Sequence, residues 1–255
     1  MDARIQVTLA ANAGVLLRYG DTAILLDVLF SYEENAFCAP SPAVREKILR
    51  GDPPFEKVDY LLFTHLHSDH FSGELTGEYL RRHPVKGLLL PLAEEEARPE
   101  YLNALGESGT ACFFLTGRTA RADFRLSLDL EVTAFRTLHL DEKYHAVPHF
   151  CYLIRCGQKR LFFTSDADYR LETFSFLGDA PLRAVFVNPL FFSDLQRRRF
   201  FRGSLPTETV VVYHLPFPLE DEKTLGRMFS RSLREWPEDG PGVRVLEREL
   251  ETIEL

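Results

Sequence analysis

The sequence predicts an α/β protein in which helices cover two packed β-sheets, built as a single domain over residues 1–255. Of the 255 residues, 45% are hydrophobic and 27% are charged, so a chain of this length can bury a sizeable core without disulfide bonds. The strand-like segments form two runs, each accompanied by helix-like segments, which indicates two sheets with helices outside. No linker, repeat or low-complexity tract divides the chain.

The first run opens with three short strands, separated by Ala-Asn-Ala-Gly and Tyr-Gly-Asp turns, at residues 5–9, 15–18 and 23–28. A helix is expected over residues 42–50, because proline suits a first helical turn and Gly51 suits a stop. The apolar residues 58–63 indicate a buried strand. The rest of this run is expected as a helix at 73–82, a strand at 85–90 and a helix at 93–105 that is interrupted at Pro99.

The second run is mostly β. Apolar runs and alternating apolar and polar residues predict its strands, and helical patterns lie between or after them. The strands are expected at 112–115, 124–128, 130–132, 151–155, 160–164, 184–187, 209–213 and 243–247, and the helices at 170–177, 194–202 and 220–235.

The charge balance excludes some classes of partner. The formal net charge is −8 at pH 7, so no broad cationic field would attract phosphate backbones, and we do not expect a nucleic-acid partner. No stretch approaches about 18 consecutive apolar residues, so we expect no membrane association. The four cysteines lack CxxC spacing and the N-terminus lacks an apolar signal sequence. We therefore expect a cytoplasmic protein. Since a nucleic-acid partner is not expected, we expect a small-molecule substrate. The sequence contains no signal that indicates an oligomeric state.

Four potential metal ligands directly follow the strand at residues 58–63, namely His65, His67, Asp69 and His70. In an extended segment, side chains two residues apart point to the same side, so His65 and His67 can share one ion. Neutral imidazole nitrogens suit zinc, and Asp69 and His70 can face a second ion a few ångströms away. Because the whole chain has only eight histidines, three within six residues indicate a site.

Further donors border apolar runs elsewhere in the chain. His145 lies before the strand expected at 151–155, Asp166 follows the strand at 160–164, and His214 ends the strand at 209–213. A complete metal site requires such donors at other strand ends, since the cluster alone supplies only part of two ligand sets.

Together these residues resemble the metallo-β-lactamase-like hydrolase superfamily, whose hallmark is HxHxDH, a later His, an Asp after a strand and a last His after another strand. The resemblance extends from the opening Asn-Ala-Gly-Val-Leu-Leu and Leu-Leu-Asp segments to His214, and it implies that family's four-layer αββα sandwich. Carried over by position, it implies one metal bound by His65, His67 and His145, a second bound by Asp69, His70 and His214, and Asp166 as the bridge.

Three histidines compete for the third position of the first metal, namely His139, His145 and His149. We favour His145, because His-Ala-Val-Pro before an apolar strand resembles the branch that includes tRNA 3′-processing endonucleases. His139 and His149 stay open as alternatives, with roles next to the ligands or at the substrate if they are not ligands.

Ser165 departs from the family pattern, and His67 bears on the choice of metal. The residue before the bridging Asp is often Gly in the superfamily, whereas this chain has Ser165. The diiron flavoprotein branch carries Glu where this chain has His67. Nitrogen and carboxylate donors without thiolate therefore favour two zinc ions, with iron or manganese as alternatives.

These ligands predict a metal-dependent hydrolase. Two divalent ions lower the pKa of bound water from about 15.7 toward about 7 and polarise the bond under attack, so a metal-bridging hydroxide would attack a small ester, lactone or phosphodiester. Asp69 would orient the hydroxide and Asp166 would hold the ion pair. Metal-bound water, His139, His149 or Tyr144 would protonate the leaving group.

Two other functions are weighed against this one. The first is an RNA-processing endoribonuclease of the same superfamily, which the Val-Pro segment favours and the lack of a long basic arm disfavours. The second is a non-catalytic metal-binding sensor domain, which the complete donor set disfavours.

Substrate contacts are less well indicated. The arginine-rich residues 196–202 offer guanidinium groups for a phosphate, or form an exposed helix face. Residues 190–192, together with Leu29, Phe30 and Tyr32, would line a small-molecule pocket or belong to the core.

Overall fold

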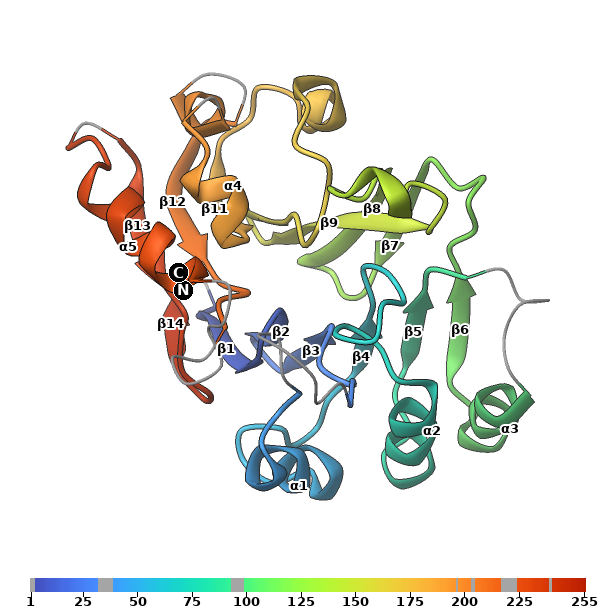
Figure 1. The fold of residues 1–255 in the computed structure, drawn as a ribbon. Helices are drawn as coiled ribbons and strands as arrows, with labels where there is room; N and C mark the ends of the chain where they lie inside the picture. Colours follow the sequence, from blue (N-terminus) through green and yellow to red (C-terminus); the bar gives the residue numbers. More distant parts are fainter. Residues whose placement is uncertain are drawn as a thin grey trace.

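Two seven-stranded sheets pack face to face, with helices on their outer faces (Figure 1). The computed structural model describes residues 3–31, 39–92, 99–195, 197–202, 205–216, 224–238 and 240–255. In spatial order, the first sheet consists of β14 (Thr252–Glu254), β1 (Ile5–Ala11), β2 (Gly14–Tyr19), β3 (Thr22–Leu26), β4 (Tyr60–Leu62), β5 (Gly87–Leu90) and β6 (Ala111–Phe114). The second consists of β13 (Gly242–Val245), β12 (Thr207–Val212), β11 (Leu182–Val187), β10 (Lys159–Phe163), β9 (His149–Cys156), β8 (Leu130–Thr137) and β7 (Arg121–Arg125).

Both sheets are mixed in the same way. In the first, β1, β2, β3 and β14 pair antiparallel, and β3 to β6 pair parallel. In the second, β7 to β10 pair antiparallel, and β10 to β13 pair parallel. Parallel strands bring their carboxyl ends to one edge of a sheet, so the residues that follow β3, β4, β10 and β12 gather there.

Alternation along the strands builds the separate core layers. In the first sheet, Ile24, Leu26 and Leu62 face the second sheet, while Leu25 and Leu61 face the helices, and all five are buried. This is the period-two pattern of a strand that is covered on both faces.

The helices that cover the first sheet are α1 (Pro42–Arg50), α2 (Gly73–Arg82) and α3 (Pro99–Ser108), and Figure 1 shows all three on its outer side. Ser41 caps α1 by accepting from the Val44 N–H at 3.4 Å, and Gly51 ends it in the left-handed conformation. Ser72 caps α2 by accepting from the Leu75 N–H at 3.2 Å. This cap fixes the point at which the histidine-rich loop becomes helix.

The second sheet is covered by α4 (Pro189–Ser193) and α5 (Leu225–Arg234), with the 3₁₀ helices η3 (Leu171–Leu177) and η4 (Arg197–Arg202). Phe191, Phe192 and Phe229 bury their rings against the outward-facing valines of β11 and β12. Another 3₁₀ helix, η2 (Glu142–Tyr144), lies between β8 and β9.

The predicted fold class, a four-layer αββα sandwich, is confirmed. The segments expected as α-helices at 170–177 and 194–202 contain 3₁₀ turns instead. In η3, the buried side chains Phe174 and Leu177 are three residues apart, which is the 3₁₀ repeat. The expected helical residues 93–98 and 220–223, as well as Tyr32 and Gln196, lie outside the described residues.

The structure adds β14, which the sequence analysis did not predict, at the edge beside β1. Within the described ranges, none of the helices has the length and apolar character needed to cross a lipid bilayer.

Candidate metal centre

Seven candidate metal ligands gather at the carboxyl-end edge of the two sheets. His65, His67, Asp69 and His70 lie on the loop between β4 and α2. Asp166 follows β10 and His214 follows β12. The seventh ligand, His139, follows β8, so both sheets contribute to one site. The ligand atoms form two groups, within each of which all atoms lie within 4.8 Å of one another: His65, His67 and His139; and Asp69, His70, Asp166 and His214.

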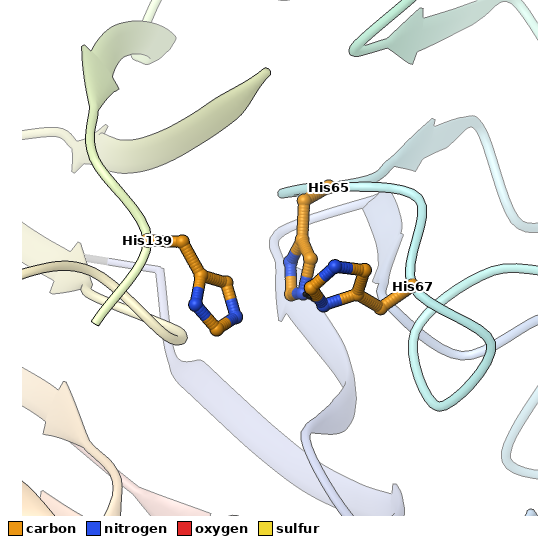
Figure 2. A group of neighbouring side chains, drawn as sticks. All are labelled: His65, His67 and His139. Carbon is orange, nitrogen blue, oxygen red and sulfur yellow. Dashed lines mark hydrogen bonds between the residues drawn. The ribbon is translucent and has the colours of Figure 1, made fainter. Parts of the chain in front are cut away.

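In the first group, three imidazoles point toward one another from two sides (Figure 2). The Nε2 atom of His65 lies 3.0 Å from the Nδ1 atom of His67. Two nitrogens that bind one tetrahedral zinc ion at about 2.0–2.1 Å are about 3.3 Å apart, so this pair fits one ion. The Nε2 atom of His139 is buried and has no hydrogen-bond partner among the described residues, and an ion there would compensate for its desolvation.

The third histidine of this group is His139, whereas the sequence analysis favoured His145. Backbone pairing decides the position of His139. It forms a β-bridge with Ala167, and the Leu140 N–H donates to the Asp166 carbonyl at 2.7 Å, so the segment after β8 runs directly beside Asp166. The chain continues through η2, and His145 follows this helix, with its backbone N–H on the Glu142 carbonyl. His145 belongs to neither group.

The other alternative, His149, lies at the start of β9 and is fully buried. Its Nδ1 atom is 2.7 Å from the Thr137 hydroxyl, and its ring centroid is 5.0 Å from that of His65. Burial lowers the pKa of His149 to about 3. His149 therefore packs behind the first group as a neutral imidazole.

The second group contains the three residues that the resemblance assigned to the second metal, together with Asp166. The Nε2 atom of His70 lies 3.2 Å from that of His214 and 3.8 Å from Oδ2 of Asp69. Asp166 stands between the groups: its Oδ2 is 3.4 Å from Nε2 of His70 and 3.8 Å from Nε2 of His139. This is the position that a bridging carboxylate requires.

The electrostatics keep most of these donors in the form that binds metal. Burial is the largest cause that lowers the pKa of His65, His67 and His139, so these imidazoles stay neutral at neutral pH. Burial alone would raise the pKa of Asp166, but His214 and His70 outweigh it and hold the carboxyl well below its usual range. Ligands must be deprotonated to bind a metal ion, and these four meet that condition.

His70 differs in charge from His65, His67 and His139. Burial lowers its pKa, but the carboxylates of Asp69 and Asp27 outweigh burial and raise it well above 6.5. In the absence of an ion, a proton on His70 thus balances the carboxylates around it, and a divalent cation would take over that role.

Asp27, directly after β3, orients two of the histidines. Its Oδ2 atom is 3.0 Å from Nδ1 of His70 and accepts from the Thr64 hydroxyl at 2.5 Å, while Oδ1 accepts from the Thr64 N–H at 2.8 Å. The Thr64 oxygen lies 3.1 Å from Nδ1 of His65. Since a carboxylate only accepts, Nδ1 of His70 carries a proton, so Nε2, which faces Asp166, is the nitrogen that could bind a metal ion in place of its own proton.

His139 is held differently. Its Nδ1 atom accepts the Asp141 N–H at 3.0 Å, which puts the proton of the neutral ring on Nε2. Ligation through Nε2 therefore requires that hydrogen bond to be given up. This sets His139 apart from His65 and His70, whose Nδ1 atoms face acceptors.

Two buried asparagines, which the sequence analysis did not identify, fix the loops that carry the ligands. Asn188 donates to Oδ1 of Asp166 at 3.2 Å and caps α4 by accepting from the Phe191 N–H at 2.9 Å. Asn12 donates to the Asp69 carbonyl at 3.1 Å, and its own carbonyl accepts the His214 N–H at 3.1 Å. The Asn-Pro sequence at 188–189 is an N-cap signal that could have pointed to Asn188.

Several residues around the site have left-handed backbone conformations. The φ angles are 47° for Asn12, 52° for Asp27, 49° for Ser165 and 60° for His214. Such angles are uncommon for residues other than glycine, and they concentrate where the surrounding structure enforces them. Here each residue stands at the end of a strand, where the chain must turn sharply to aim a polar group into the site.

A cavity of about 390 Å³ opens over both groups. His67, Asp69, His139, Asp166 and His214 contribute to its lining. Its volume lies within the range of small-molecule sites.

Sequence comparison agrees with this geometry. The family profile of the Metallo-beta-lactamase superfamily matches residues 8–214. The chain belongs to the metallo-β-lactamase superfamily. A search of curated proteins finds no match.

Solved structures share this superfamily's fold with the chain. The metallo-β-lactamase fold protein YhfI from Bacillus subtilis superposes with a TM-score of 0.59 at 15% identity, covering 98% of this chain and 99% of YhfI. The short form of human tRNase Z gives 0.57 at 12%, covering 97% and 98%. CmlA, a diiron β-hydroxylase from Streptomyces venezuelae, gives 0.60 at 18%, covering all of this chain and 54% of CmlA. A fold shared with a hydroxylase and a nuclease does not by itself define the reaction.

The backbone angle at Ser165 explains why glycine suits the position before the bridging Asp. The residue before Asp166 has a φ of 49°, an angle that glycine adopts without strain. Ser165 instead adds a hydroxyl, which lies 2.9 Å from the Thr64 hydroxyl and joins the network around Asp27.

The hypotheses on substrate contacts have mixed outcomes. Arg198 does not line the cavity over the ligand groups; its Nε atom donates to the Phe192 carbonyl, and it lines a second cavity beside Trp236. Leu190 does line the first cavity. Phe191 and Phe192 belong to the core, as do Leu29 and Phe30.

Proposed function

We propose that this member of the metallo-β-lactamase superfamily is a hydrolase that uses two divalent metal ions, with zinc as the first candidate, to cleave a small ester, lactone or phosphodiester. The observation that carries the proposal is the position of Asp166. Its carboxylate stands between three imidazoles on one side and the second group on the other, with Oδ1 3.5 Å from Nε2 of His214 and Oδ2 3.8 Å from Nε2 of His139.

The donor set fits two ions. His65, His67 and His139 would hold the first, Asp69, His70 and His214 the second, and Asp166 both. When bound, two such ions supply Lewis acidity and bring the deprotonation of water near neutral pH. Asp27 and Thr64 keep the lone pairs of His70 and His65 directed into the site.

A group in the cavity would also have to donate a proton to the leaving group. Of the three side chains considered, His149 is fully buried and does not line the cavity, and His139 belongs to the first ligand group. Tyr144 lines the cavity and stands outside both ligand groups. We therefore assign proton donation to the Tyr144 hydroxyl.

The first experiment measures the ratio of metal to chain by plasma mass spectrometry, in protein that is purified without chelator and again after zinc reconstitution. We expect two ions per chain in the wild-type protein and a loss in His67→Ala and His139→Ala. His145→Ala is the matched control and should retain two ions, because His145 lies outside both groups. Retention of both ions by His139→Ala would refute the assignment of the first group.

Activity is then screened on the loaded protein with bis(p-nitrophenyl) phosphate, p-nitrophenyl acetate, a γ-lactone and a structured RNA. Hydrolysis of a small substrate that falls with His67→Ala supports the proposal. Cleavage of the RNA alone would favour a nuclease, and two bound ions without any hydrolysis would favour a sensor.

A further inference from the structure

The cavity over the metal centre has parts of different chemistry. Leu190 and Leu225, at the starts of α4 and α5, supply apolar surface. The 3₁₀ helix η2 supplies Lys143 and Tyr144. Among the described residues that line the cavity, Lys143 is the only lysine or arginine.

The ammonium group of Lys143 is held at this place by its own helix. Its Nζ atom lies 2.9 Å from Oδ2 of Asp141, and it sits 4.5 Å from the centroid of the Tyr144 ring. Asp141 also caps η2 by accepting the Lys143 N–H at 3.2 Å. An ammonium group has three N–H donors, so the bond to Asp141 leaves capacity for a ligand.

Tyr144 connects this cation to the metal centre. Its ring centroid lies 4.4 Å from that of His67 and 5.1 Å from that of His139. The ammonium group and two candidate ligands of the first metal thus contact the same tyrosine ring. A molecule that reacts at the metal centre and extends across Tyr144 reaches Lys143.

The ion pair between Lys143 and Asp141 contributes little to the stability of the fold. The Lys143 side chain is 63% exposed and that of Asp141 is 40% exposed. Ion pairs at such exposure contribute between about 0 and 1 kcal/mol. The other charged side chains in the lining, apart from histidines, are acidic, and two of them, Asp69 and Asp166, belong to the second ligand group. Lys143 is the cation among these charged side chains, and an anionic group on a ligand would complement it.

We propose that Lys143 binds a carboxylate on the substrate, at the end opposite to the bond that is cleaved, while Leu190 and Leu225 contact its apolar part. This inference rests on the proposed function and narrows its substrate class to small esters, lactones or phosphodiesters that carry a separate carboxylate. Lys143 is a specificity-determining residue in this scheme and takes no part in the bond cleavage.

The test uses two non-hydrolysable probes that differ by one group, phenylphosphonate and 4-carboxyphenylphosphonate. The phosphonate is an anion for the metal centre, and the ring places the carboxylate at a fixed distance from it. Affinity is measured by isothermal titration calorimetry on zinc-loaded protein. We expect the carboxylated probe to bind wild type roughly tenfold more tightly, an effect of one charge-assisted hydrogen bond of about 1.4 kcal/mol.

Two variants assign the effect. Lys143→Gln should abolish the preference and leave the affinity for phenylphosphonate unchanged. Glu142→Gln is the matched control, since Glu142 is exposed on the same 3₁₀ helix and does not line the cavity, and it should keep the tenfold preference.

The outcomes separate the two proposals. If both probes bind wild type equally, or if Lys143→Gln keeps the preference, the inference on Lys143 is wrong and the hydrolase proposal stands. If neither probe binds the loaded protein, the metal centre does not accept an anionic ligand, and the proposed function fails with the inference.

Discussion

Replacing Ser165 tests whether the turn into Asp166 stores backbone strain. Ser165 is fully buried, has a φ of 49° and places its hydroxyl 2.9 Å from that of Thr64. Glycine would relieve a left-handed penalty of about 1–2 kcal/mol and lose a hydrogen bond worth about 1 kcal/mol. It would also add about 0.5–1 kcal/mol of unfolded-state entropy. These terms nearly cancel, so Ser165→Gly should match the wild-type stability to within about 0.5 kcal/mol.

Alanine at the same position separates the two effects. Ser165→Ala loses the hydrogen bond but keeps the Cβ atom in the left-handed conformation, so it should be about 1 kcal/mol less stable than wild type. For a chain of this size, that corresponds to a fall of about 3 °C in Tm. The assay is urea unfolding of the metal-free protein, followed by circular dichroism, with thermal unfolding as the second readout.

Ser232 provides the matched control, because it is a buried serine inside the α-helix α5. In a helix, glycine is about 1 kcal/mol less favourable than alanine, so the order of the two variants should reverse at this position. An alanine variant at Ser165 that is as stable as the glycine variant would refute the strain argument, provided that the reversed order is seen at Ser232.

Three further changes have defined outcomes. Asp27→Asn removes the carboxylate that orients His70, so we expect a roughly 10- to 100-fold weaker second metal site in competition with a chromophoric chelator; unchanged affinity would rule out that role. The pKa of His149 falls through burial from 6.5 to about 3, so between these pH values only the unfolded chain binds its proton, and stability rises with pH. His149→Gln should remove about 1.4 kcal/mol per pH unit from that slope in metal-free protein, as measured by urea unfolding from pH 4 to pH 6. Gly14→Ala would place a Cβ atom 2.7 Å from the Asp27 carbonyl oxygen and should lower the free energy of unfolding by about 1–3 kcal/mol. In Gly106→Ala, on helix α3, the new Cβ atom would meet nothing within 4 Å, so this variant should raise the free energy of unfolding by about 1 kcal/mol in the same assay.

The sequence was most informative where the chemistry is contiguous. His65, His67, Asp69 and His70 follow an apolar strand within six residues, so both their grouping and their place at a strand end could be predicted. Strand patterns located most of both sheets for a similar reason, since alternation is a local property. The 3₁₀ segments were predicted as α-helices because a period of three and one of 3.6 differ little over seven residues.

The choice among the three histidines depended on contacts far apart in the sequence. His139 enters the first group because its segment pairs with Ala167 on the other side of the β9–β10 hairpin. His145 had the more suggestive neighbours, but they describe only the approach to β9. Asp27 and Asn188 were not identified as site residues for a related reason: each is a single polar residue after a strand, and its partners, His70 and Asp166, lie 43 and 22 residues away.

The arrangement of strand ends explains how the site can be strained and still be well ordered. Each left-handed residue raises the energy of the folded chain by about 1–2 kcal/mol, and such a turn would open in an isolated loop. Here the turns at Asp27 and Ser165 are tied to the same Thr64 hydroxyl, through bonds of 2.5 and 2.9 Å, and Thr64 lies two residues after the end of β4. Opening one turn would therefore disturb both sheets. Because the sheets hold these turns, the ligand groups are brought together by the fold, and a metal ion would bind to a site that is already formed.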